Sequence, residues 1–394
     1  MTPRAFGETL RRMTRVLIAG AGVAAVESVL ALRALAGTQV EIELLAPAPE
    51  LVLRPSSVQT PFGGAPAPRI ALADLAGQLE VRLHRDGLAS VESEQHHVLT
   101  RDGDYVPYEI LVVATGARSH EAVSGAVTFR GPMSAGAVEQ AVARVLSEPQ
   151  LRLAFVAPAG SRWVLPLYEL ALLSAAMLRD GGVADPDIVV ATPEHAPLEA
   201  LGAAVGEAVR GALDRAGIDL ITSATAVGAF EGAVRLESGG LIEADVAIAL
   251  PELVGPRIAG LPHDDEGYLP VDVHGRVAGC ADVYAAGDAT SFPLKHGGLA
   301  AQQADAVAEA IGARLGTVGL PEPFRPVLRA MMLTGADPLY LRAELGTGGL
   351  LPAAGTVSAE PLWSPPGKIG GRYIAAFLES GAAGDPLKDF HTTM

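Results

Sequence analysis

The chain of 394 residues contains a single cysteine, Cys280. One thiol excludes an intramolecular disulfide, a CxxC redox pair and a cysteine-rich metal site. The histidines show no metal-binding spacing either, since His195, His263 and His274 have no near partner in the sequence. We therefore expect no metal, and electrons that pass through this protein need a carrier other than its thiols.

Positive charge is also scarce. Lys and Arg together number 29 against 45 Asp and Glu, which gives a net charge of −16, and only Lys295, Lys368 and Lys388 are lysines. The electric field of a protein with this net charge repels phosphate groups. The composition therefore argues against binding of nucleic acid and against bulk binding to an anionic membrane. With 49% hydrophobic and 19% charged residues, the chain has enough apolar surface for two or three domain-sized cores.

Long uncharged apolar runs are missing. Arginines before the run 16–32 imitate a secretory signal, but Glu27 interrupts the run. The next candidate, residues 163–178, is broken by Pro166 and Glu169. We expect no transmembrane segment and a cytoplasmic location, with at most peripheral contact with the inner face of the membrane.

The first third of the chain reads as a βαβ unit. Residues 15–20 form an expected buried parallel strand, 22–37 a small-residue helix and 39–45 a second strand. Residues 46–80 are rich in Pro and Gly and predict an ordered, functional loop. Three short apolar runs within 79–113 predict a β-meander followed by a buried strand.

A second α/β unit follows. Its expected strands and helices are residues 151–158, 167–179, 187–191, 198–217, 220–221, 233–236 and 245–250. Residues 262–318 then rejoin the first unit. From 319 onward, helix-like segments such as 331–345 alternate with Pro/Gly-rich ones.

The most informative motif is the GxGxxA of residues 20–25, directly after a strand and opening a helix. Gly20 permits the tight turn, Gly22 lets the backbone approach a pyrophosphate, and Ala25 allows the helix to pack closely on the strand. The alternative is a Gly/Ala-rich turn in an Ala-rich protein. The acidic residue expected after the second strand is absent, because that position is occupied by Ala46 and its neighbours. We place Ala46 and Arg54 in the cofactor site.

Two further motifs accompany it, an ATG that ends in Thr115-Gly116 and a VYAAGD that ends in Gly287-Asp288. Their order and separation resemble the two-dinucleotide-binding-domain flavoproteins of the pyridine nucleotide-disulfide oxidoreductase superfamily, over nearly the whole chain. The resemblance implies an α/β protein with two Rossmann-like FAD/NAD(P)-binding domains, the second inserted in the first, and a C-terminal interface domain. The implied boundaries are 14–122 and 262–318 for the FAD-binding domain, 123–261 for the second domain and 319–394 for the interface domain.

By this resemblance the cofactor is noncovalent FAD. Asp288 bonds the ribityl chain, and the helix that begins near Gly298-Leu299 points its N-terminus at the flavin pyrimidine. A helix N-terminus stabilises the negative charge that a reduced flavin carries there. The alternative reading of Gly287-Asp288 is a surface turn.

Residues 292–304 look closest to sulfide:quinone oxidoreductases and type II NADH dehydrogenases, in which the matching helix borders the quinone pocket. Lys295 is then a cation that stabilises reduced flavin, and His296 a proton shuttle; the alternative for each is a surface side chain. Sulfide oxidation by the usual route is disfavoured, because Cys280 is alone.

The second domain lacks a GxGxxG after its first strand. Pro158 removes a backbone donor there and Trp163 adds bulk where a pyrophosphate needs close approach. NAD(P)H binding therefore stays open. By resemblance Glu169 lies near a nicotinamide, and its alternative is a structural role at the start of a helix.

Taken together, the sequence predicts an FAD-dependent oxidoreductase that moves two electrons from an unidentified small donor to a quinone or similar acceptor. Two alternatives stay open: an NAD(P)H dehydrogenase with an altered second nucleotide site, and a noncatalytic flavin-binding protein. The segment 363–378 combines aromatic, basic and apolar residues, and we expect it to cap the flavin face, touch a membrane or form a packing surface. The chain is expected to be a homodimer or a monomer.

Overall fold

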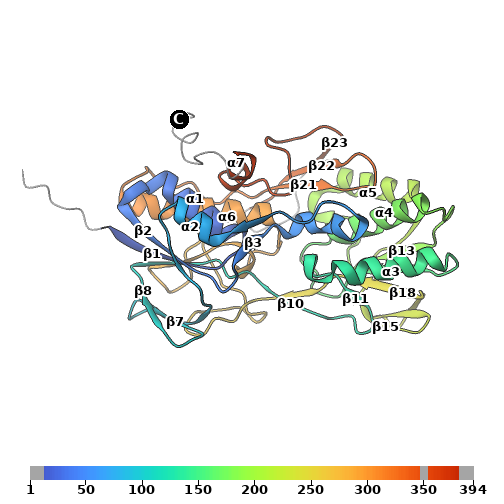
Figure 1. Ribbon diagram of the computed structural model, residues 1–394, viewed down its shortest axis with the longest axis horizontal. Helices are drawn as coiled ribbons and strands as arrows, with labels where there is room; N and C mark the ends of the chain where they lie inside the picture. The colour runs from blue at the N-terminus through green and yellow to red at the C-terminus, as the bar shows by residue number, and fades with distance from the viewer. Residues whose placement is uncertain (1–12, 347–353, 381–394) are drawn as a thin grey trace, which may run out of the picture.

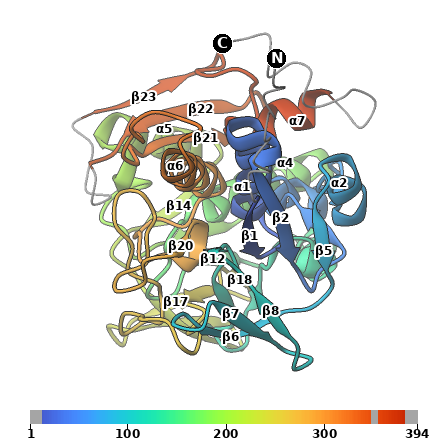
Figure 2. The ribbon, with the colours of Figure 1, turned by 90° about the vertical axis from the view of Figure 1, so that its left-hand side faces the viewer.

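A computed structural model describes residues 13–346 and 354–380 of the chain. The molecule is elongated, with one parallel sheet towards each end and a C-terminal antiparallel sheet along one long side (Figure 1, Figure 2). Arg11 and Arg12, which precede the first strand, lie outside the described residues. So do 347–353 and 381–394 of the expected interface domain.

The first sheet is parallel and has the strand order β20-β9-β1-β2-β5. Its strands are β1 (Thr14–Ala19), β2 (Val40–Leu45), β5 (Arg82–His84), β9 (Ile110–Val113) and β20 (Val283–Ala285). The continuous apolar runs of β1 and β9 are buried because helices and strands cover both faces of the sheet. Val283 of β20 pairs with Leu111 of β9, so a strand from late in the chain completes the first sheet.

Two helices cover one face of this sheet, α1 (Val23–Ala36) and α6 (Gly297–Leu315). Both are rich in alanine, and small side chains let them pack closely against each other and the strands. The expected loop 46–80 contains β3 (Glu50–Val52), the 3-10 helix η2 (Arg54–Phe62), β4 (Arg69–Ala71) and α2 (Leu72–Gln78).

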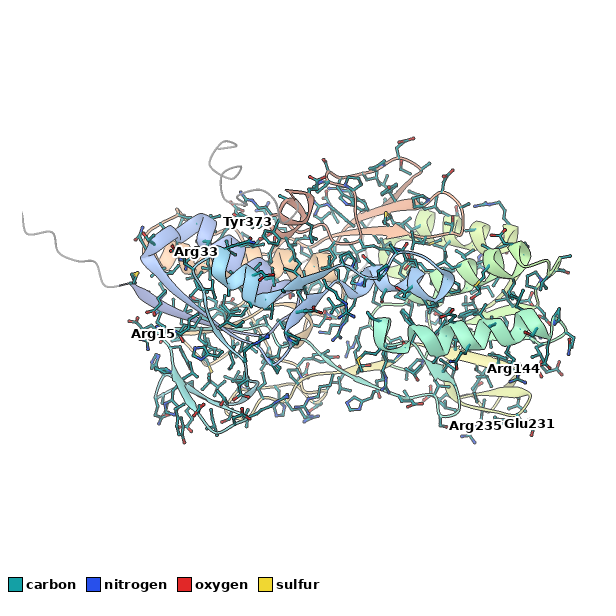
Figure 3. The ribbon with its side chains drawn as sticks, in the orientation of Figure 1. Arg15, Arg33, Arg144, Glu231, Arg235 and Tyr373 are labelled. Carbon is teal, nitrogen blue, oxygen red and sulfur yellow. The ribbon has the colours of Figure 1, made fainter. Side chains whose placement is uncertain are left out.

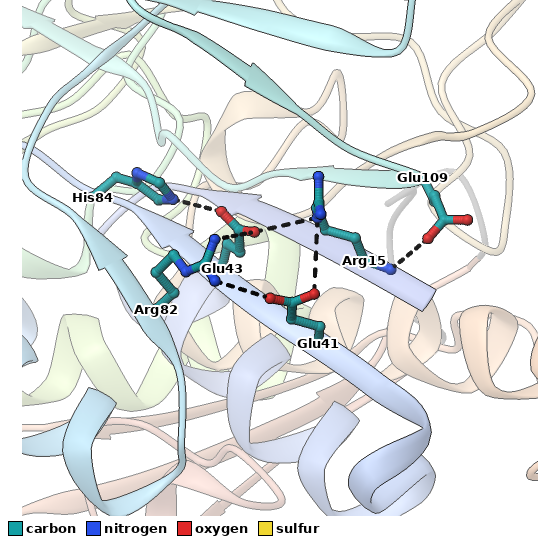
Figure 4. A network of polar contacts seen from close by, with 6 residues as sticks. All are labelled: Arg15, Glu41, Glu43, Arg82, His84 and Glu109. Atoms are coloured by element: carbon teal, nitrogen blue, oxygen red, sulfur yellow. Dashed lines mark hydrogen bonds and ion pairs between the residues drawn. The ribbon is translucent and has the colours of Figure 1, made fainter. Parts of the chain in front are cut away.

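The expected meander is correct in part. The antiparallel sheet β6-β7-β8 consists of β6 (Leu88–Glu92), β7 (His97–Thr100) and β8 (Tyr105–Pro107). The first of the three apolar runs, however, forms β5, which pairs in parallel with β2 in the main sheet. Polar side chains link these strands: His84 Nε2 of β5 lies 2.5 Å from Glu43 Oε2 of β2, and Arg82 of β5 and Arg15 of β1 also contact the buried Glu43 (Figure 4).

The second parallel sheet has the order β11-β18-β12-β13-β14. Its strands are β11 (Val127–Thr128), β12 (Leu153–Val156), β13 (Ile188–Ala191), β14 (Ile218–Ile221) and β18 (Val246–Ala249). Its helices are α3 (Ala135–Ser147), α4 (Leu165–Asp180) and α5 (Ala203–Arg215). The helix expected over 198–217 starts later, because Gly202, at φ +90, separates α5 from the short 3-10 helix η4 (Glu199–Leu201).

Small antiparallel sheets flank the second domain. One contains β15 (Ala226–Phe230), β16 (Ala233–Leu236) and β17 (Leu241–Glu243), and the other pairs β10 (Arg118–His120) with β19 (Glu252–Val254). Strand β10 lies where the chain leaves the first unit after β9, and β19 lies where the chain returns to it after β18. The insertion of one Rossmann-like unit into the other is therefore visible in the topology.

The C-terminal region differs from the sequence expectation. Residues 331–345 were expected to be helix-like, but they form part of the antiparallel sheet β21-β22-β23, whose strands are β21 (Val327–Met332), β22 (Leu339–Glu344) and β23 (Gly355–Ser358). Burial alternates residue by residue along β21, the period of a strand with one buried face. A short helix, α7 (Ile374–Ser380), follows; Tyr373 at its start lies at the same end of the molecule as Arg33 of α1 (Figure 3). Among the described residues, no helix combines the length and apolarity needed to cross a membrane.

Candidate functional site

The glycine turn after β1 has the geometry of a phosphate-binding turn. Gly20 has a φ of +146, and a Cβ there would lie 2.1 Å from the carbonyl oxygen of Ala114, so no side chain fits. Gly22 faces open space, since no atom lies within 4 Å of a Cβ built on it. No side chain caps α1, and its first N–H groups remain available for an anion. Ala25 is fully buried against the sheet.

Other predicted cofactor residues lie at the same carboxyl edge of the first sheet. Ala46 follows β2, and its N–H donates to the carbonyl of His84 at 2.9 Å. Thr115 and Gly116 follow β9; Thr115 is exposed and Gly116 has a φ of +74. Arg54 is exposed at the first residue of η2. This edge is where open α/β sheets bind their ligands.

Gly287 and Asp288 follow β20 and adjoin the start of α1. Gly287 has a φ of +76, and a Cβ there would lie 2.9 Å from that of Ala24, so glycine is needed for the close approach. The Asp288 carboxylate accepts no hydrogen bond from another residue in the described part of the chain. Burial raises its pKa, and the nearby charges of Lys295 and Arg54 oppose that rise. An unpaired acceptor beside an open phosphate turn fits the hydroxyls of a ribityl chain, so these residues fit FAD.

Lys295 is buried in the loop after Asp288. Its Nζ donates to the carbonyls of Thr290 at 2.5 Å and Phe292 at 2.8 Å, and lies 3.8 Å from the ring centre of Tyr268. Burial lowers the pKa of Lys295 to about 8, against the opposing effect of Asp288. Lys295 is therefore not the surface side chain that the sequence left as an alternative. Its hydrogen bonds hold the loop that carries Asp288.

His296 caps α6 at its N-terminus. Its Nδ1 accepts the N–H of Gly298 at 3.1 Å, so the ring proton is on Nε2. Burial lowers the pKa of His296 to about 4, with a further contribution from the charge of Lys368. The imidazole is therefore neutral at pH 7. Trp163 packs edge-on against it with the ring centres 5.1 Å apart, and Leu299 is buried in the first turn of α6.

Glu169 lies on α4 and forms a buried ion pair with Lys368 of the C-terminal segment. Its Oε1 also accepts the N–H of Leu333 at 2.8 Å. Burial raises the pKa of Glu169, and Lys368 opposes the rise. The structure thus directs this carboxylate to the C-terminal sheet. The two residues are 199 positions apart, and only the scarcity of lysine marked Lys368 in the sequence.

The loop between β12 and α4 occupies the position of a second phosphate turn. Gly160 has a φ of +70, and a Cβ built on it would lie 3.8 Å from Glu252 Oε1. Arg162 forms an ion pair with Glu266 and lies 5.4 Å from the ring centre of Tyr268. Both Arg162 and Trp163 therefore contact residues that follow the second domain. Tyr268, buried between Arg162 and Lys295, had no motif to reveal it in the sequence.

Glu194 lies just beyond β13, at the carboxyl edge of the second sheet. Its carboxylate accepts the Tyr168 hydroxyl at 2.6 Å and the N–H of Leu198 at 3.1 Å. Burial raises the pKa of Glu194 to about 7.

No group of three or more His, Cys, Asp or Glu side chains suited to a metal occurs in the part of the chain that is described.

Known proteins resemble this chain in sequence and in fold. The sequence profile of the pyridine nucleotide-disulphide oxidoreductase family matches residues 170–311. The ferredoxin reductase component of a chlorobenzene dioxygenase from Cupriavidus sp. (strain PS12) is 29% identical, and the alignment covers 86% of this chain and 85% of that protein.

Solved structures share the fold. The sulfide:quinone oxidoreductase from Aquifex aeolicus superposes with a TM-score of 0.80 at 18% identity, over 88% of this chain and 86% of that one. The ferredoxin reductase for the CYP199A2 system from Rhodopseudomonas palustris gives a TM-score of 0.64 at 20% identity, over 84% and 82%.

The two nested Rossmann-like units, together with these relatives, define an FAD-dependent oxidoreductase. The family match over residues 170–311 and the similarity to a ferredoxin reductase component support a flavoprotein of the pyridine nucleotide-disulfide oxidoreductase superfamily.

Proposed function

We propose that this protein moves two electrons through noncovalently bound FAD from a small donor other than NAD(P)H to a quinone or a similar acceptor. The observation that carries the proposal is the loop before α4. Arg162 and Trp163, where a nucleotide pyrophosphate and nicotinamide would approach, are already engaged with Glu266, Tyr268 and His296.

The FAD-side residues suit electron transfer. FAD, when bound, accepts and releases an electron pair. Asp288, Thr115 and the turn Gly20–Gly22 hold the cofactor, and the N-terminus of α6 together with Lys295 stabilises negative charge beside it.

A quinone that takes up two electrons also takes up two protons. Lys368 is held in a buried ion pair with Glu169 and is close enough to His296 to lower its pKa. Neutral His296, beside this ion pair, presents a fixed Nε2–H that can position the acceptor. A small redox protein is the rival acceptor, in keeping with the similarity to a ferredoxin reductase component.

The deciding experiment is anaerobic stopped-flow mixing of the purified holoprotein with NADH or NADPH at millimolar concentration. We expect no rapid bleaching of the flavin absorbance. Dithionite-reduced protein should then be reoxidised by a soluble quinone such as decylubiquinone. Rapid bleaching by either nucleotide contradicts the assignment of the donor, and reduced protein that decylubiquinone does not reoxidise contradicts that of the acceptor.

The second candidate function is an NAD(P)H dehydrogenase, and one observation favours it. Glu194 lies at the carboxyl edge of β13, where dinucleotide-binding domains place the acid that bonds a ribose. Its carboxylate is engaged by Tyr168. If NADH does bleach the flavin, Glu194→Gln should raise the NADH concentration needed for half-maximal rate; an unchanged value removes this candidate role for Glu194.

We also propose that the protein is cytoplasmic, a monomer or homodimer, and in peripheral contact with the membrane through the segment 363–378. Phe377 and Leu378 of α7 pack against the core of the first unit and leave part of their apolar surface exposed, which is the surface that such contact would use. Flotation with phosphatidylcholine vesicles tests it, and light scattering after gel filtration measures the oligomeric state. Protein that stays entirely with the lipid-free fraction contradicts the membrane contact.

A further inference from the structure

A cavity of about 200 Å³ lies beside β20, on residues that the cofactor site does not use. Its walls come from the hairpin 271–275, the loop 291–293 and Phe324. Phe292 and Phe324 meet edge-on with their ring centres 5.3 Å apart. This wall is aromatic and suits a planar apolar group.

One buried polar group lines the cavity. Gln303 of α6 is only 7% exposed, and its Oε1 accepts the N–H of Gly287 at 2.7 Å and the hydroxyl of Thr290 at 3.4 Å. The Gly287 N–H can only donate, so it fixes the orientation of the amide and assigns Nε2 to the other side. Within residues 13–346 and 354–380, Nε2 donates to no acceptor. Nε2 is not fully buried but open to the cavity, so a ligand that displaces water from it must bring an acceptor of its own.

The volume of the cavity and the charge on its wall restrict the kind of ligand that it can bind. A volume of 200 Å³ corresponds to about six or seven liquid water molecules, enough for one ring with a short substituent. Asp272 lies on the wall, and its Oδ1 accepts the N–H groups of His274 and Arg276, both at 2.9 Å. This carboxylate and the net charge of −16 disfavour an anionic ligand.

We propose that this cavity binds a neutral single-ring carbonyl compound, with the ring against Phe292 and Phe324 and the carbonyl oxygen accepting from Gln303 Nε2. The site shares one loop with the cofactor. Gln303 holds Gly287 through its other amide atom, and Lys295 holds the carbonyl of Phe292. Any change in FAD affinity on ligand binding must therefore be matched by an equal change in ligand affinity on FAD binding.

The test uses the FAD-loaded protein and needs no turnover. Acetophenone is the probe, and ethylbenzene is the matched control, because it has nearly the same shape and no carbonyl. We expect ligand-observed saturation-transfer NMR to show binding of acetophenone. Ethylbenzene should bind about tenfold more weakly, since it leaves the Gln303 donor unpaired. Equal binding of the two compounds would overturn the assignment of the polar contact.

Cavity-filling variants locate the site. Val273 and Ser291 are exposed at its walls, so Val273→Trp and Ser291→Trp should fill it without disturbing the core. Leu320, 97% exposed and outside the walls, supplies the control Leu320→Trp. Both filling variants should lose acetophenone binding by about tenfold or more, while the control keeps it. Retained binding in both filling variants, with FAD content unchanged, means that the probe binds elsewhere and the proposal is wrong.

Discussion

The carboxyl groups of Glu27 on α1 and Asp305 on α6 lie next to each other in the interior, and each acts on the pKa of the other. Glu27 also accepts the N–H groups of Tyr373 at 2.8 Å and Ile374 at 2.6 Å, and so holds the start of α7. Two neighbouring carboxylates oppose each other's ionisation, so we expect the pair to hold one proton between them. The C-terminal segment is thus anchored at two buried glutamates, Glu27 of the first unit and Glu169 of the second.

This pair predicts a loss of stability at high pH. Burial raises the pKa of both carboxyls above their ordinary values; Glu27 raises the pKa of Asp305 further, whereas Asp305 partly opposes the rise for Glu27. The folded state therefore binds more protons than the unfolded one, and the free energy of unfolding should fall as pH rises from the ordinary range, about 4, through the raised values.

Urea unfolding from pH 5 to pH 9 measures this effect. Asp305→Asn removes one charge and keeps a donor for Glu27, so the variant should show a smaller decline than the parent protein. The exposed Asp104 offers a matched control, Asp104→Asn. If the parent and Asp305→Asn decline equally, the shared proton is not the cause.

Asp288 should be required for cofactor retention. Replacement by alanine removes the unpaired acceptor beside the glycine turn, and we expect flavin-poor protein after purification; Asp288→Asn keeps an acceptor oxygen and should retain more. The ratio of absorbance at the flavin and protein maxima reports it, with Asp104→Ala as the control. Full FAD content in Asp288→Ala would count against the assigned role.

Lys295 should make FAD retention depend on pH. Its pKa is about 8, so its positive charge beside Asp288 is present below that pH and lost above it. The parent protein should release FAD more readily as pH rises from 7 to 9.5, measured by ultrafiltration. Lys295→Met should hold FAD more weakly at pH 7 and show a flatter profile. A parent profile that is already flat would show that the charge of Lys295 does not act on the cofactor.

The Glu169–Lys368 pair should be strongly coupled. Lys368→Met leaves a buried carboxylate without its cation, which costs about 3–5 kcal/mol of unfolding free energy. The double variant Glu169→Gln/Lys368→Met should recover much of that loss, because it leaves no unpaired charge. Chemical denaturation of the four proteins in the cycle measures the coupling. Additive effects would mean that the two side chains act independently.

Much of the first unit follows from local sequence. The run of β1, the glycines at 20 and 22 and the alanines of α1 are neighbours in the chain, and sterics alone require small residues where helix, strand and ligand meet. The same holds for Gly287-Asp288 after β20. These motifs predicted both the cofactor edge and the return of the chain to the first sheet.

Other features had no local signal. Residues 331–345 contain Met, Leu, Ala and Glu, which favour helix, yet pairing of β21 with β22 over the core decides for strand. Lys368 and Glu169, or Arg162 and Tyr268, meet only because distant elements pack together.

The sequence by itself therefore determined the class of protein and the cofactor, because a dinucleotide imposes its requirements on a few consecutive residues. Only the tertiary structure decided which charges are buried, which of them are paired and what covers the second phosphate turn. Burial and pairing depend on residues far apart in the chain, and these set the pKa values of Lys295, His296 and Glu194.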